Sequence, residues 1–172
     1  MEQKMISVRP EDFDGVFSRI GKDWMLIGAS DGKHDNVMTA SWGGLGVLWH
    51  KPVAFCFIRP QRYTYSLTEK SNRLSLAFFD GEEYRSALTF CGRASGRDGD
   101  KFAGAGLTKE LTETGVPYPA EASVVLICRK LYADDIKESA FIDSEMLSHY
   151  AKKDYHRVYI CEIESVLVKE NV

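Results

Sequence analysis

The amino-acid sequence predicts a mainly β protein with short helices, in which antiparallel strands close into a barrel. Apolar, strand-like runs recur along the chain and are separated by short turns. Strands and helices do not alternate regularly, which argues against a doubly wound parallel sheet and favours an antiparallel barrel. A length of 172 residues without internal repeats, low-complexity segments or a domain-sized linker indicates one domain over residues 1–172.

The first elements expected from the N-terminus are a helix and a β-hairpin. Pro10–Ile20 predicts the helix, because its apolar side chains recur near helical spacing. Trp24–Ala29 predicts a strand, Asp31-Gly32-Lys33 a turn, and Val37–Trp42 the hairpin partner of that strand. The apolar residues that define the opening helix are Phe13, Val16, Phe17 and Ile20.

A buried strand followed by a helix is expected in the middle of the chain. Leu45–Lys51 is interpreted as a connection, with Trp49 either capping the core or lining a site. Val53–Ile58 is a continuous apolar run, which is consistent with a strand buried on both faces. Pro60 suits the first turn of a helix and predicts one that continues through Tyr65–Lys70.

The remaining elements are mostly strands. Glu82–Cys91 predicts a helix with apolar residues on one face. Either Asp98 or Asp100 is expected to cap a short helix that follows. The segment Ile136–Tyr150 is ambiguous. Further strands are expected at Arg73–Phe79, Ser123–Tyr132 and Tyr155–Val168.

The stretch Asn36–Gly44 combines an amide, two hydroxyls, an indole and adjacent glycines, a mixture that no simple strand or helix needs. Thr39 and Ser41 would share one face of a strand, because side chains alternate. Gly43 and Gly44 would let the backbone turn or approach a ligand closely. Two interpretations follow: a binding edge for a planar polar heterocycle, or a strand end followed by a glycine turn.

Basic and hydroxyl side chains follow the buried strand. Arg59 and Arg62 carry planar forks of donors that match phosphate geometry, and Tyr63 and Thr64 add hydroxyls. The residues from Arg62 to Thr64 would lie in the opening turn of a helix, where free amides favour anions. The cluster predicts either an anion site or two solvated arginines that flank a strand.

A third cluster, Gly92–Phe102, is rich in turn residues and contains Ser95 and Lys101. It lacks the glycine spacing and the terminal Lys-Ser/Thr of a nucleotide-hydrolase phosphate loop. Its Gly-Arg-Ala-Ser-Gly run also lacks the serine-hydrolase pattern Gly-x-Ser-x-Gly. Neither of these chemistries is therefore expected here.

Together the three clusters resemble the flavin reductase-like family of FMN-binding split barrels, of the flavoredoxin type. The motifs that carry the resemblance are Met-Thr-Ala-Ser-Trp at 38–42, Arg-Pro-Gln-Arg-Tyr-Thr at 59–64, and Ser-Gly-Arg at 95–97 with Asp-Lys-Phe at 100–102. The resemblance covers about Trp24–Val168. It implies a Greek-key antiparallel split β-barrel that binds FMN against a dimer interface.

The resemblance also implies a role for each cluster. The first cluster would meet the flavin ring, and basic and hydroxyl groups would hold the phosphate. The main phosphate contacts would come from Arg59, Arg62, Thr64 and Lys101, with Ser95 assisting. The full set of expected cofactor-binding residues is Asn36, Met38, Thr39, Ala40, Ser41, Trp42, Arg59, Arg62, Tyr63, Thr64, Ser95 and Lys101.

Late in the chain, Asp154-Tyr155-His156 and Cys161-Glu162 resemble the family's Asp-His segment and Gly-Glu pair. The inserted Tyr155 and the cysteine at 161 are departures from that pattern. His156 is expected beside the flavin, where an imidazole would position the electron donor or acceptor without acting as an obligatory acid or base. The alternative is a histidine on a strand face that bonds to Asp154 or to the backbone.

The function implied by the resemblance is that of an FMN-binding oxidoreductase. Reducing equivalents would pass from NADH, NADPH or a reduced protein partner through bound FMN. The cofactors themselves perform hydride transfer, so no catalytic triad is expected. Two alternatives are a flavoredoxin-like electron carrier without its own nicotinamide-dependent activity, and a split-barrel enzyme acting on a pyridoxine phosphate. The Met-Thr-Ala-Ser-Trp segment fits the first family better than the last.

The resemblance further implies a homodimer with the flavin near the subunit boundary. Aromatic residues are enriched at interfaces, although they could equally belong to the core, which is the preferred interpretation for Trp49. The aromatic residues expected around the site are Trp42, Trp49, Tyr63, Tyr65 and Phe102.

Composition excludes several other classes. A net charge of −3 without a long basic run argues against nucleic-acid binding. No stretch approaches the roughly 20 apolar residues of a membrane helix. The N-terminus lacks the apolar core of a secretory signal, so a cytoplasmic location is expected. Scattered cysteines and histidines give no metal or redox-dithiol spacing. Buried structural thiols are expected at Cys56, Cys128 and Cys161.

Overall fold

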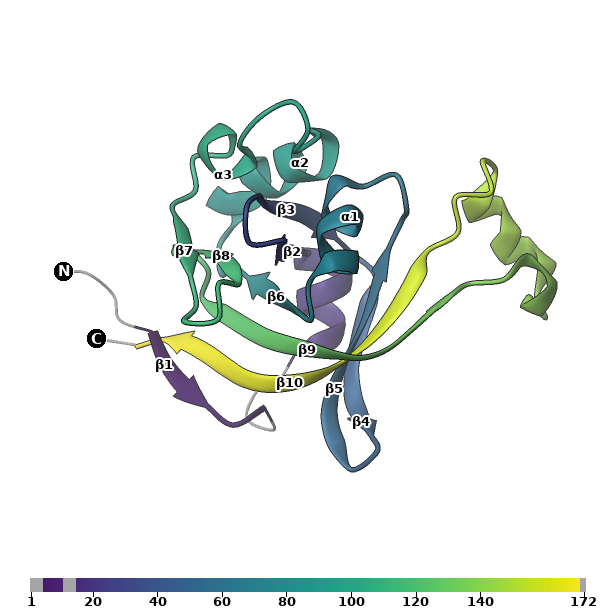
Figure 1. Cartoon of the computed structure of the whole chain (residues 1–172), viewed down its shortest axis with the longest axis horizontal. Coiled ribbons are helices and arrows are strands. Elements are labelled where there is room, and N and C mark those ends of the chain that lie inside the picture. Colours follow the sequence, from purple (N-terminus) through teal and green to yellow (C-terminus); the bar gives the residue numbers. More distant parts are fainter. Residues whose placement is uncertain (1–4, 11–14, 171–172) are drawn as a thin grey trace.

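The computed structural model describes residues 5–10 and 15–170, and its main element is an eight-stranded antiparallel sheet (Figure 1). The strand order is β3-β2-β6-β9-β10-β5-β4, and β1 pairs with β10 outside this path. The sheet confirms the antiparallel architecture expected from the sequence. Its strands are β1 (Met5–Val8), β2 (Met25–Ser30), β3 (Asp35–Ala40), β4 (Gly43–Leu48), β5 (Lys51–Ile58), β6 (Arg73–Phe78), β9 (Val124–Asp135) and β10 (Arg157–Lys169).

The remaining elements are short helices and a second, two-stranded sheet. No helix in the described part of the chain is long and apolar enough to cross a membrane. The expected opening helix is described only in part, because residues 11–14, including Phe13, lie outside the described ranges. The other elements are a helical segment at Ser18–Asp23, α1 (Tyr63–Lys70), a 3-10 turn at Glu82–Tyr84, α2 (Arg85–Arg93), α3 (Lys101–Gly104), β7 (Lys109–Leu111) and β8 (Pro117–Pro119).

The β2–β3 hairpin confirms the first predicted strand pair. Its register runs from Met25 opposite Ala40 to Ser30 opposite Asp35. The carboxylate of Asp31 accepts backbone N–H groups within the turn, as expected from turn chemistry. The second strand ends at Ala40, so Ser41 and Trp42 lie just beyond its last paired residue.

Strand β4 corrects the sequence-based expectation for Leu45–Lys51. This stretch is not a simple connection, and Gly43 and Gly44 do not form a turn, because Gly43–Leu48 pairs with β5. The glycines lack β propensity of their own. The ring of Phe55 on the facing strand lies within van der Waals reach of a Cβ built on either Gly44 or Gly46. An aromatic side chain over strand glycines compensates for their missing side chains.

Two further expectations for this region need correction. Val53–Ile58 belongs to a longer strand that begins at Lys51, and the side chains of Phe55 and Phe57 are only partly buried. The run is therefore not buried on both faces throughout. Trp49 lies at the β4–β5 turn with 53% of its surface exposed, so the preferred interpretation as a core residue was wrong.

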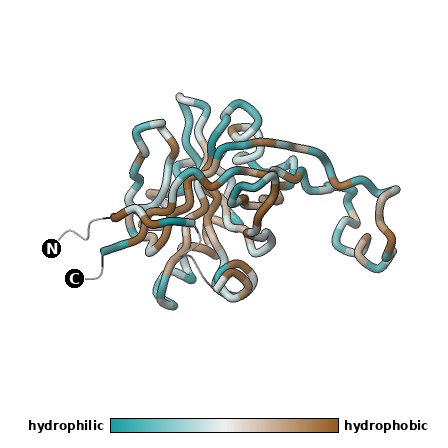
Figure 2. Tube along the Cα trace, turned by 90° about the horizontal axis from the view of Figure 1, so that it is seen from below, coloured by the Kyte–Doolittle hydropathy of each residue, from teal (hydrophilic) through white to brown (hydrophobic). Residues whose placement is uncertain are grey.

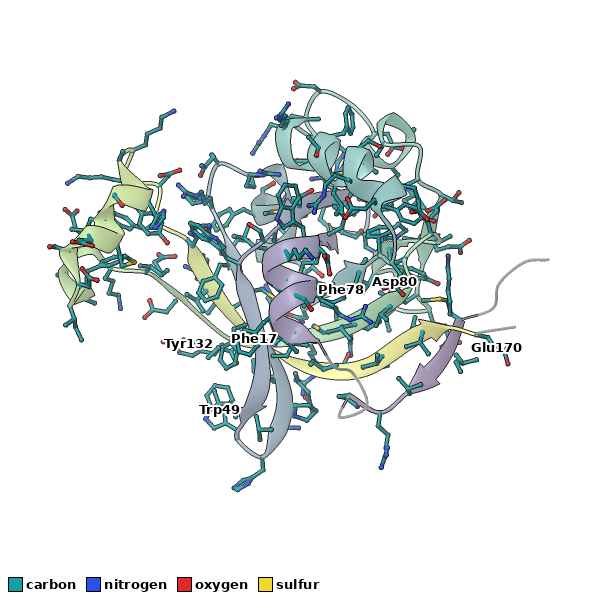
Figure 3. All side chains as sticks on the ribbon, turned by 180° about the vertical axis from the view of Figure 1, so that it is seen from behind. Phe17, Trp49, Phe78, Asp80, Tyr132 and Glu170 are labelled. Atoms are coloured by element: carbon teal, nitrogen blue, oxygen red, sulfur yellow. The ribbon has the colours of Figure 1, made fainter. Side chains whose placement is uncertain are left out.

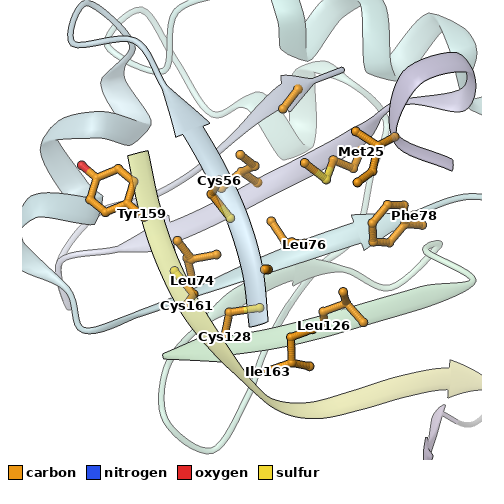
Figure 4. Close-up of a cluster of buried hydrophobic side chains, with 14 of the residues drawn as sticks. Met25, Cys56, Leu74, Leu76, Phe78, Leu126, Cys128, Tyr159, Cys161 and Ile163 are labelled. Atoms are coloured by element: carbon orange, nitrogen blue, oxygen red, sulfur yellow. The ribbon is translucent and has the colours of Figure 1, made fainter. Parts of the chain in front are cut away.

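The interior of the barrel is a single cluster of buried apolar side chains (Figure 4). Phe78, Leu126 and Tyr159 are among its largest members. The expected buried thiols of Cys56, Cys128 and Cys161 are confirmed, and each is a free cysteine. A second cluster lies on the other face of β2, β6 and β9, beneath α2 and α3, and includes Leu26, Leu88, Cys91 and Phe102.

The ambiguous segment Ile136–Tyr150 belongs to an arm that leaves the barrel between β9 and β10 (Figure 1). The two strands pair from Val124–Val168 as far as Asp135–Arg157, where the arm begins. Its helical turns are 3-10 segments at Glu138–Ala140 and Ser144–Tyr150. Figure 2 shows that hydrophobic residues run along the strands of the body and recur in the arm. The arm therefore carries apolar side chains outside the main core.

Candidate functional site

A cavity of about 200 Å³ opens where β3 and β5 end. The sequence places it here because β3 stops at Ala40 and β5 at Ile58, so the residues that follow face the same space. The expected residues Met38, Thr39, Ala40, Ser41 and Trp42 all line this cavity, together with Phe57, Arg59, Arg62 and His156. We call it the ring cavity, because the rings of Trp42, Phe57 and His156 line it.

A second pocket, of about 170 Å³, adjoins the ring cavity because both are lined by Arg62. It lies between the N-terminus of α1 and the C-terminus of α2. The expected residues Asn36, Tyr63, Ser95 and Lys101 line it. The remaining lining residues are Gln61, Arg93, Ala94 and Gly96. We call it the cationic pocket.

Two cations of the cationic pocket are held by backbone carbonyls. Arg62 donates to the carbonyl oxygens of Gly92 at 2.9 Å and Cys91 at 3.1 Å. Lys101 donates to the same carbonyl of Cys91 at 2.6 Å, although only 3% of its surface is exposed. These carbonyls end helix α2, where the helix dipole favours positive charge. No carboxylate of the described residues forms an ion pair with either cation.

Burial changes the acid–base behaviour of both cations. It lowers the pKa of Lys101 to about 8, with the nearby Arg62 charge adding to the effect. Burial also lowers the pKa of Arg62, which remains charged at neutral pH. A buried cation without an anionic partner is costly. The pocket therefore favours binding of an anion.

The wall of the cationic pocket is closely packed. The amide nitrogen of Asn36 donates to the hydroxyl of Thr64 at 2.9 Å, and both side chains are buried. Thr64 thus lies behind Asn36 and holds it in place. A Cβ on Gly96 would lie 2.2 Å from the Oδ1 of Asn36 and 2.7 Å from the Tyr63 ring. Only glycine fits at position 96. The turn-rich sequence alone did not reveal that this position must be a glycine.

Arg59 takes a different direction from Arg62. It forms an ion pair with Asp154 at 2.5 Å and donates to the carbonyl of His149 at 2.9 Å. Its guanidinium also lies 5.1 Å from the ring centroid of Tyr150. Arg59 therefore links the end of β5 to His149 and Asp154 of the arm, beside the ring cavity. The structure does not bring it into the cationic pocket with Arg62 and Lys101.

The short helix after the cationic pocket begins as predicted. The side chain of Asp100 accepts the backbone N–H groups of Phe102 and Ala103, which confirms Asp100 as the capping residue. Ser95 behaves as a turn residue, because its hydroxyl accepts the backbone N–H of Arg97 at 3.2 Å. Thr39 donates its hydroxyl hydrogen to the carbonyl of Leu88, which ties the ring cavity to α2.

His156 lies at the inner wall of the ring cavity, with 7% of its surface exposed. Its Nδ1 lies 2.9 Å from the hydroxyl of Tyr150, so its partner is neither Asp154 nor the backbone. The Trp42 and Phe57 rings lie 5.3 and 6.4 Å from the imidazole centroid. Burial, aided by Arg59, lowers the pKa of His156 to about 4. The imidazole is therefore neutral at neutral pH.

An apolar groove of about 600 Å³ continues from the ring cavity, with which it shares Ser41, Trp42 and Phe57. Phe17 lines it and is 96% exposed. Figure 3 shows Phe17, Trp49 and Tyr132 on the side of the molecule that carries the β4–β5 hairpin. Of the aromatic residues expected around the site, Phe102 instead belongs to the second core cluster.

Comparisons with known proteins agree with this architecture. The family model for the flavin reductase like domain matches residues 17–172. Among curated proteins there is no match to the chain. Several solved structures of flavin-binding proteins share the fold at low sequence identity.

An FMN-binding domain of a flavin reductases-like enzyme from Shewanella baltica OS155 is 17% identical, with a TM-score of 0.70; the match covers 98% of this chain and 79% of that one. The flavoredoxin of Desulfovibrio vulgaris (Miyazaki F) is 23% identical, with a TM-score of 0.66 and coverage of 86% and 69%. The NADH:FAD oxidoreductase SgcE6 of Streptomyces globisporus C-1027, solved with NAD and FAD fragments, is 14% identical, with a TM-score of 0.63 and coverage of 84% and 73%.

At these identities the structural matches establish the fold, and the expected split β-barrel with short helices is confirmed. The family model covers nearly the whole described barrel together with its arm. The chain therefore belongs to the flavin reductase like domain family.

Proposed function

We propose that the chain, as a single domain, binds FMN non-covalently and passes reducing equivalents through it from NADH, NADPH or a reduced protein partner. The ring cavity would take the isoalloxazine, and the adjoining cationic pocket the phosphate. Support comes from the family match and from structural relatives that are described as FMN-binding proteins. We expect about one FMN per subunit.

The observation that carries this proposal is a pair of cations without an anionic partner, of which Lys101 is buried and Arg62 is half-buried. Within the described residues, Arg62 and Lys101 donate hydrogen bonds only to backbone carbonyls. A phosphate dianion would supply the missing negative charge and accept charge-assisted hydrogen bonds from both side chains. Arg62 lines both the cationic pocket and the ring cavity, which supports a single ligand that extends across the two.

The protein's own contribution is binding and orientation. Bound FMN would supply the hydride and electron chemistry. Thr39 and Ser41 would offer hydroxyls to the polar edge of the ring, while Trp42 and Phe57 would contact its apolar parts. The Asn36–Thr64 hydrogen bond would keep the wall of the phosphate end fixed. Such fixed positions reduce the reorganisation needed when charge develops on the ring.

The proposal predicts that Arg62→Ala weakens FMN binding far more than riboflavin binding. Loss of a charge-assisted hydrogen bond costs about 1.5–3 kcal/mol, or roughly tenfold to hundredfold in affinity. Riboflavin lacks the phosphate and should bind both proteins similarly. Quenching of flavin fluorescence measures both affinities.

Arg97→Ala is the matched control for this experiment. Arg97 is exposed, stacks on the Tyr63 ring at 5.2 Å and donates to the carbonyl of Gln61, but does not line the cationic pocket. Its removal should change FMN affinity little. Equal losses of riboflavin and FMN affinity in Arg62→Ala would contradict phosphate recognition. Release of FAD on denaturation, or failure of FMN to saturate the protein, would reject FMN as the cofactor.

The electron donor is tested separately. We expect the FMN-loaded protein to be bleached under anaerobic conditions by NADH or NADPH, measured as loss of flavin absorbance in a stopped-flow instrument. A yellow protein that neither nucleotide bleaches, but that a reduced redox protein does, would identify an electron carrier instead. FMN binding and donor identity thus have independent readouts.

We also propose a homodimer in which the apolar groove is covered by a second copy of the chain. The groove shares Ser41, Trp42 and Phe57 with the ring cavity, so a subunit seated there would border the flavin. Its rim includes Phe17, which is almost fully exposed in the isolated chain. Exposed apolar patches of this kind are typical of protein–protein contacts.

A further inference from the structure

The most informative unexplained group is the hydrogen-bonded pair formed by Tyr150 and His156. The pair joins the arm to the start of β10, and both side chains are buried. Nδ1 of His156 faces the Tyr150 hydroxyl, while the ring lines the ring cavity. No described residue forms a hydrogen bond with Nε2. A side chain more than nine-tenths buried thus keeps one polar atom for a ligand in this cavity.

The partner of Nδ1 determines which nitrogen of the neutral imidazole carries the proton. If Nδ1–H donated to Tyr150, the tyrosine hydroxyl hydrogen would need another acceptor, and among the described residues this hydroxyl has no hydrogen-bond partner besides His156. If Tyr150 donates instead, its hydrogen is satisfied and Nδ1 acts as the acceptor. Nε2 then carries the proton and is a hydrogen-bond donor.

We propose that Tyr150 is a positioning residue that fixes His156 in the Nε2–H tautomer, so that the ring cavity selects a planar ligand by its carbonyl oxygen. The identity of the ligand rests on the proposed function, whereas the tautomer does not. The shared chemistry is a carbonyl conjugated to a flat ring. It is present in the isoalloxazine, in the carboxamide of a nicotinamide, and in a quinone acceptor.

The surroundings of the pair favour a neutral donor over a charged one. Burial raises the pKa of Tyr150, and His156 is neutral for the same reason. The nearest cation, Arg59, is occupied by Asp154 and by the carbonyl of His149. The Trp42 and Phe57 rings around the imidazole favour a flat ligand. His156 would therefore orient a carbonyl and not protonate it.

The first experiment measures the tautomer in the flavin-free protein labelled with ¹⁵N-histidine. In the wild type we expect a pyridine-like shift for Nδ1 of His156 and a pyrrole-like shift for Nε2. In Tyr150→Phe the Nδ1–H form should become populated. Tyr155→Phe is the matched control, because its ring lies 4.9 Å from that of Tyr150 but its hydroxyl contacts Glu138.

The wild-type spectrum alone can overturn the proposal, whether or not Tyr150→Phe folds. A protonated Nδ1 in the wild type would do so, as would an unchanged tautomer ratio in a folded Tyr150→Phe. A loss of the Nε2–H form in Tyr155→Phe would show that the effect is not specific to Tyr150.

The second experiment identifies the source of the carbonyl. The Nε2 proton signal is followed while one sample receives FMN and then NAD⁺. A separate sample receives FMN and then duroquinone. A downfield shift with FMN alone assigns the isoalloxazine, and a shift only after NAD⁺ or duroquinone assigns the second ring. Tyr150→Phe should lower the affinity for that probe roughly threefold to tenfold. If no probe moves the signal, the carbonyl role is rejected.

Failure of this inference differs from failure of the proposed function. If FMN fluorescence is quenched on binding as expected but the Nε2 proton signal does not move, the carbonyl role is rejected and FMN binding still stands. Absence of FMN binding would remove the proposed function, while the tautomer result from the flavin-free protein would still hold.

Discussion

Lys101→Met should raise the stability of the flavin-free protein and weaken FMN binding at the same time. The substitution keeps most of the side-chain volume and removes a buried charge without an anionic partner. Replacing buried charges by apolar groups is often stabilising by about 1–4 kcal/mol. The same charge would contact the FMN phosphate, so FMN affinity should fall roughly tenfold to hundredfold. Thermal unfolding and flavin fluorescence measure the two effects.

The lowered pKa of Lys101 predicts opposite pH trends for stability and binding. Its pKa of about 8 lies below its ordinary value of 10.5, so the unfolded chain binds more protons between these values. The contribution of Lys101 to stability therefore rises as pH increases from about 8 to 10.5. FMN affinity should fall over the same interval, because the phosphate needs the charged amine.

Lys101→Met should remove both of these trends, and Lys33→Met serves as the control. Lys33 is exposed in the β2–β3 turn, so its loss should change neither stability nor FMN affinity measurably. A wild-type FMN affinity that stays constant from pH 7 to 10 would contradict phosphate contact by Lys101. A less stable Lys101→Met would show that its hydrogen bond to Cys91 outweighs the cost of burial.

The double substitution Phe17→Asp/Val47→Lys should convert the proposed dimer to a monomer. Phe17 and Val47 are 96% and 78% exposed in the single chain, so these changes cost the isolated barrel little. Val47 and Leu45 lie on the same face of β4, because side chains alternate along a strand, and Leu45 lines the groove. Charges placed in a buried interface should weaken association by roughly 10²-fold or more.

The measurement for this variant is light scattering at micromolar concentration, combined with FMN titration. FMN affinity should fall with dimerisation, because the groove continues into the ring cavity. Leu111→Lys on β7 is the control, since it places a charge at another exposed apolar residue outside the groove. A wild-type protein that is a 19.4 kDa monomer with full flavin occupancy would contradict the dimer.

Sequence patterns identified most strands and helices because those elements carry their own local signals. β6, β9 and β10 are each rich in apolar residues, and the side chain of Asp100 caps α3 by accepting the N–H of Phe102, two residues along the chain. Strand β4 escaped prediction because its stability depends on a tertiary contact, the Phe55 ring over its glycines. The arm at 136–156 escaped because irregular 3-10 turns have no periodic pattern.

The candidate site shows the same limit. Motif segments brought Met38–Trp42 and Arg62 together in the prediction, and the structure places them around one cavity because each lies at or just after a recognisable strand end. Nothing local could reveal that Arg59 turns toward Asp154, which lies 95 residues along the chain. Tyr150 was missed for a similar reason, because only the folded arm brings its hydroxyl to His156.

The alkylation rates of the four free cysteines would report how often the fold transiently opens. All are buried, so an alkylating reagent can reach them only when the barrel or the α2 region transiently opens. Alkylation followed by peptide mass spectrometry would separate opening of the barrel, reported by Cys56, Cys128 and Cys161, from opening near Cys91. A ligand that binds only the closed form must slow the labelling in proportion to its occupancy. The protection of Cys91, whose carbonyl accepts hydrogen bonds from both pocket cations, would then report ligand binding in the cationic pocket.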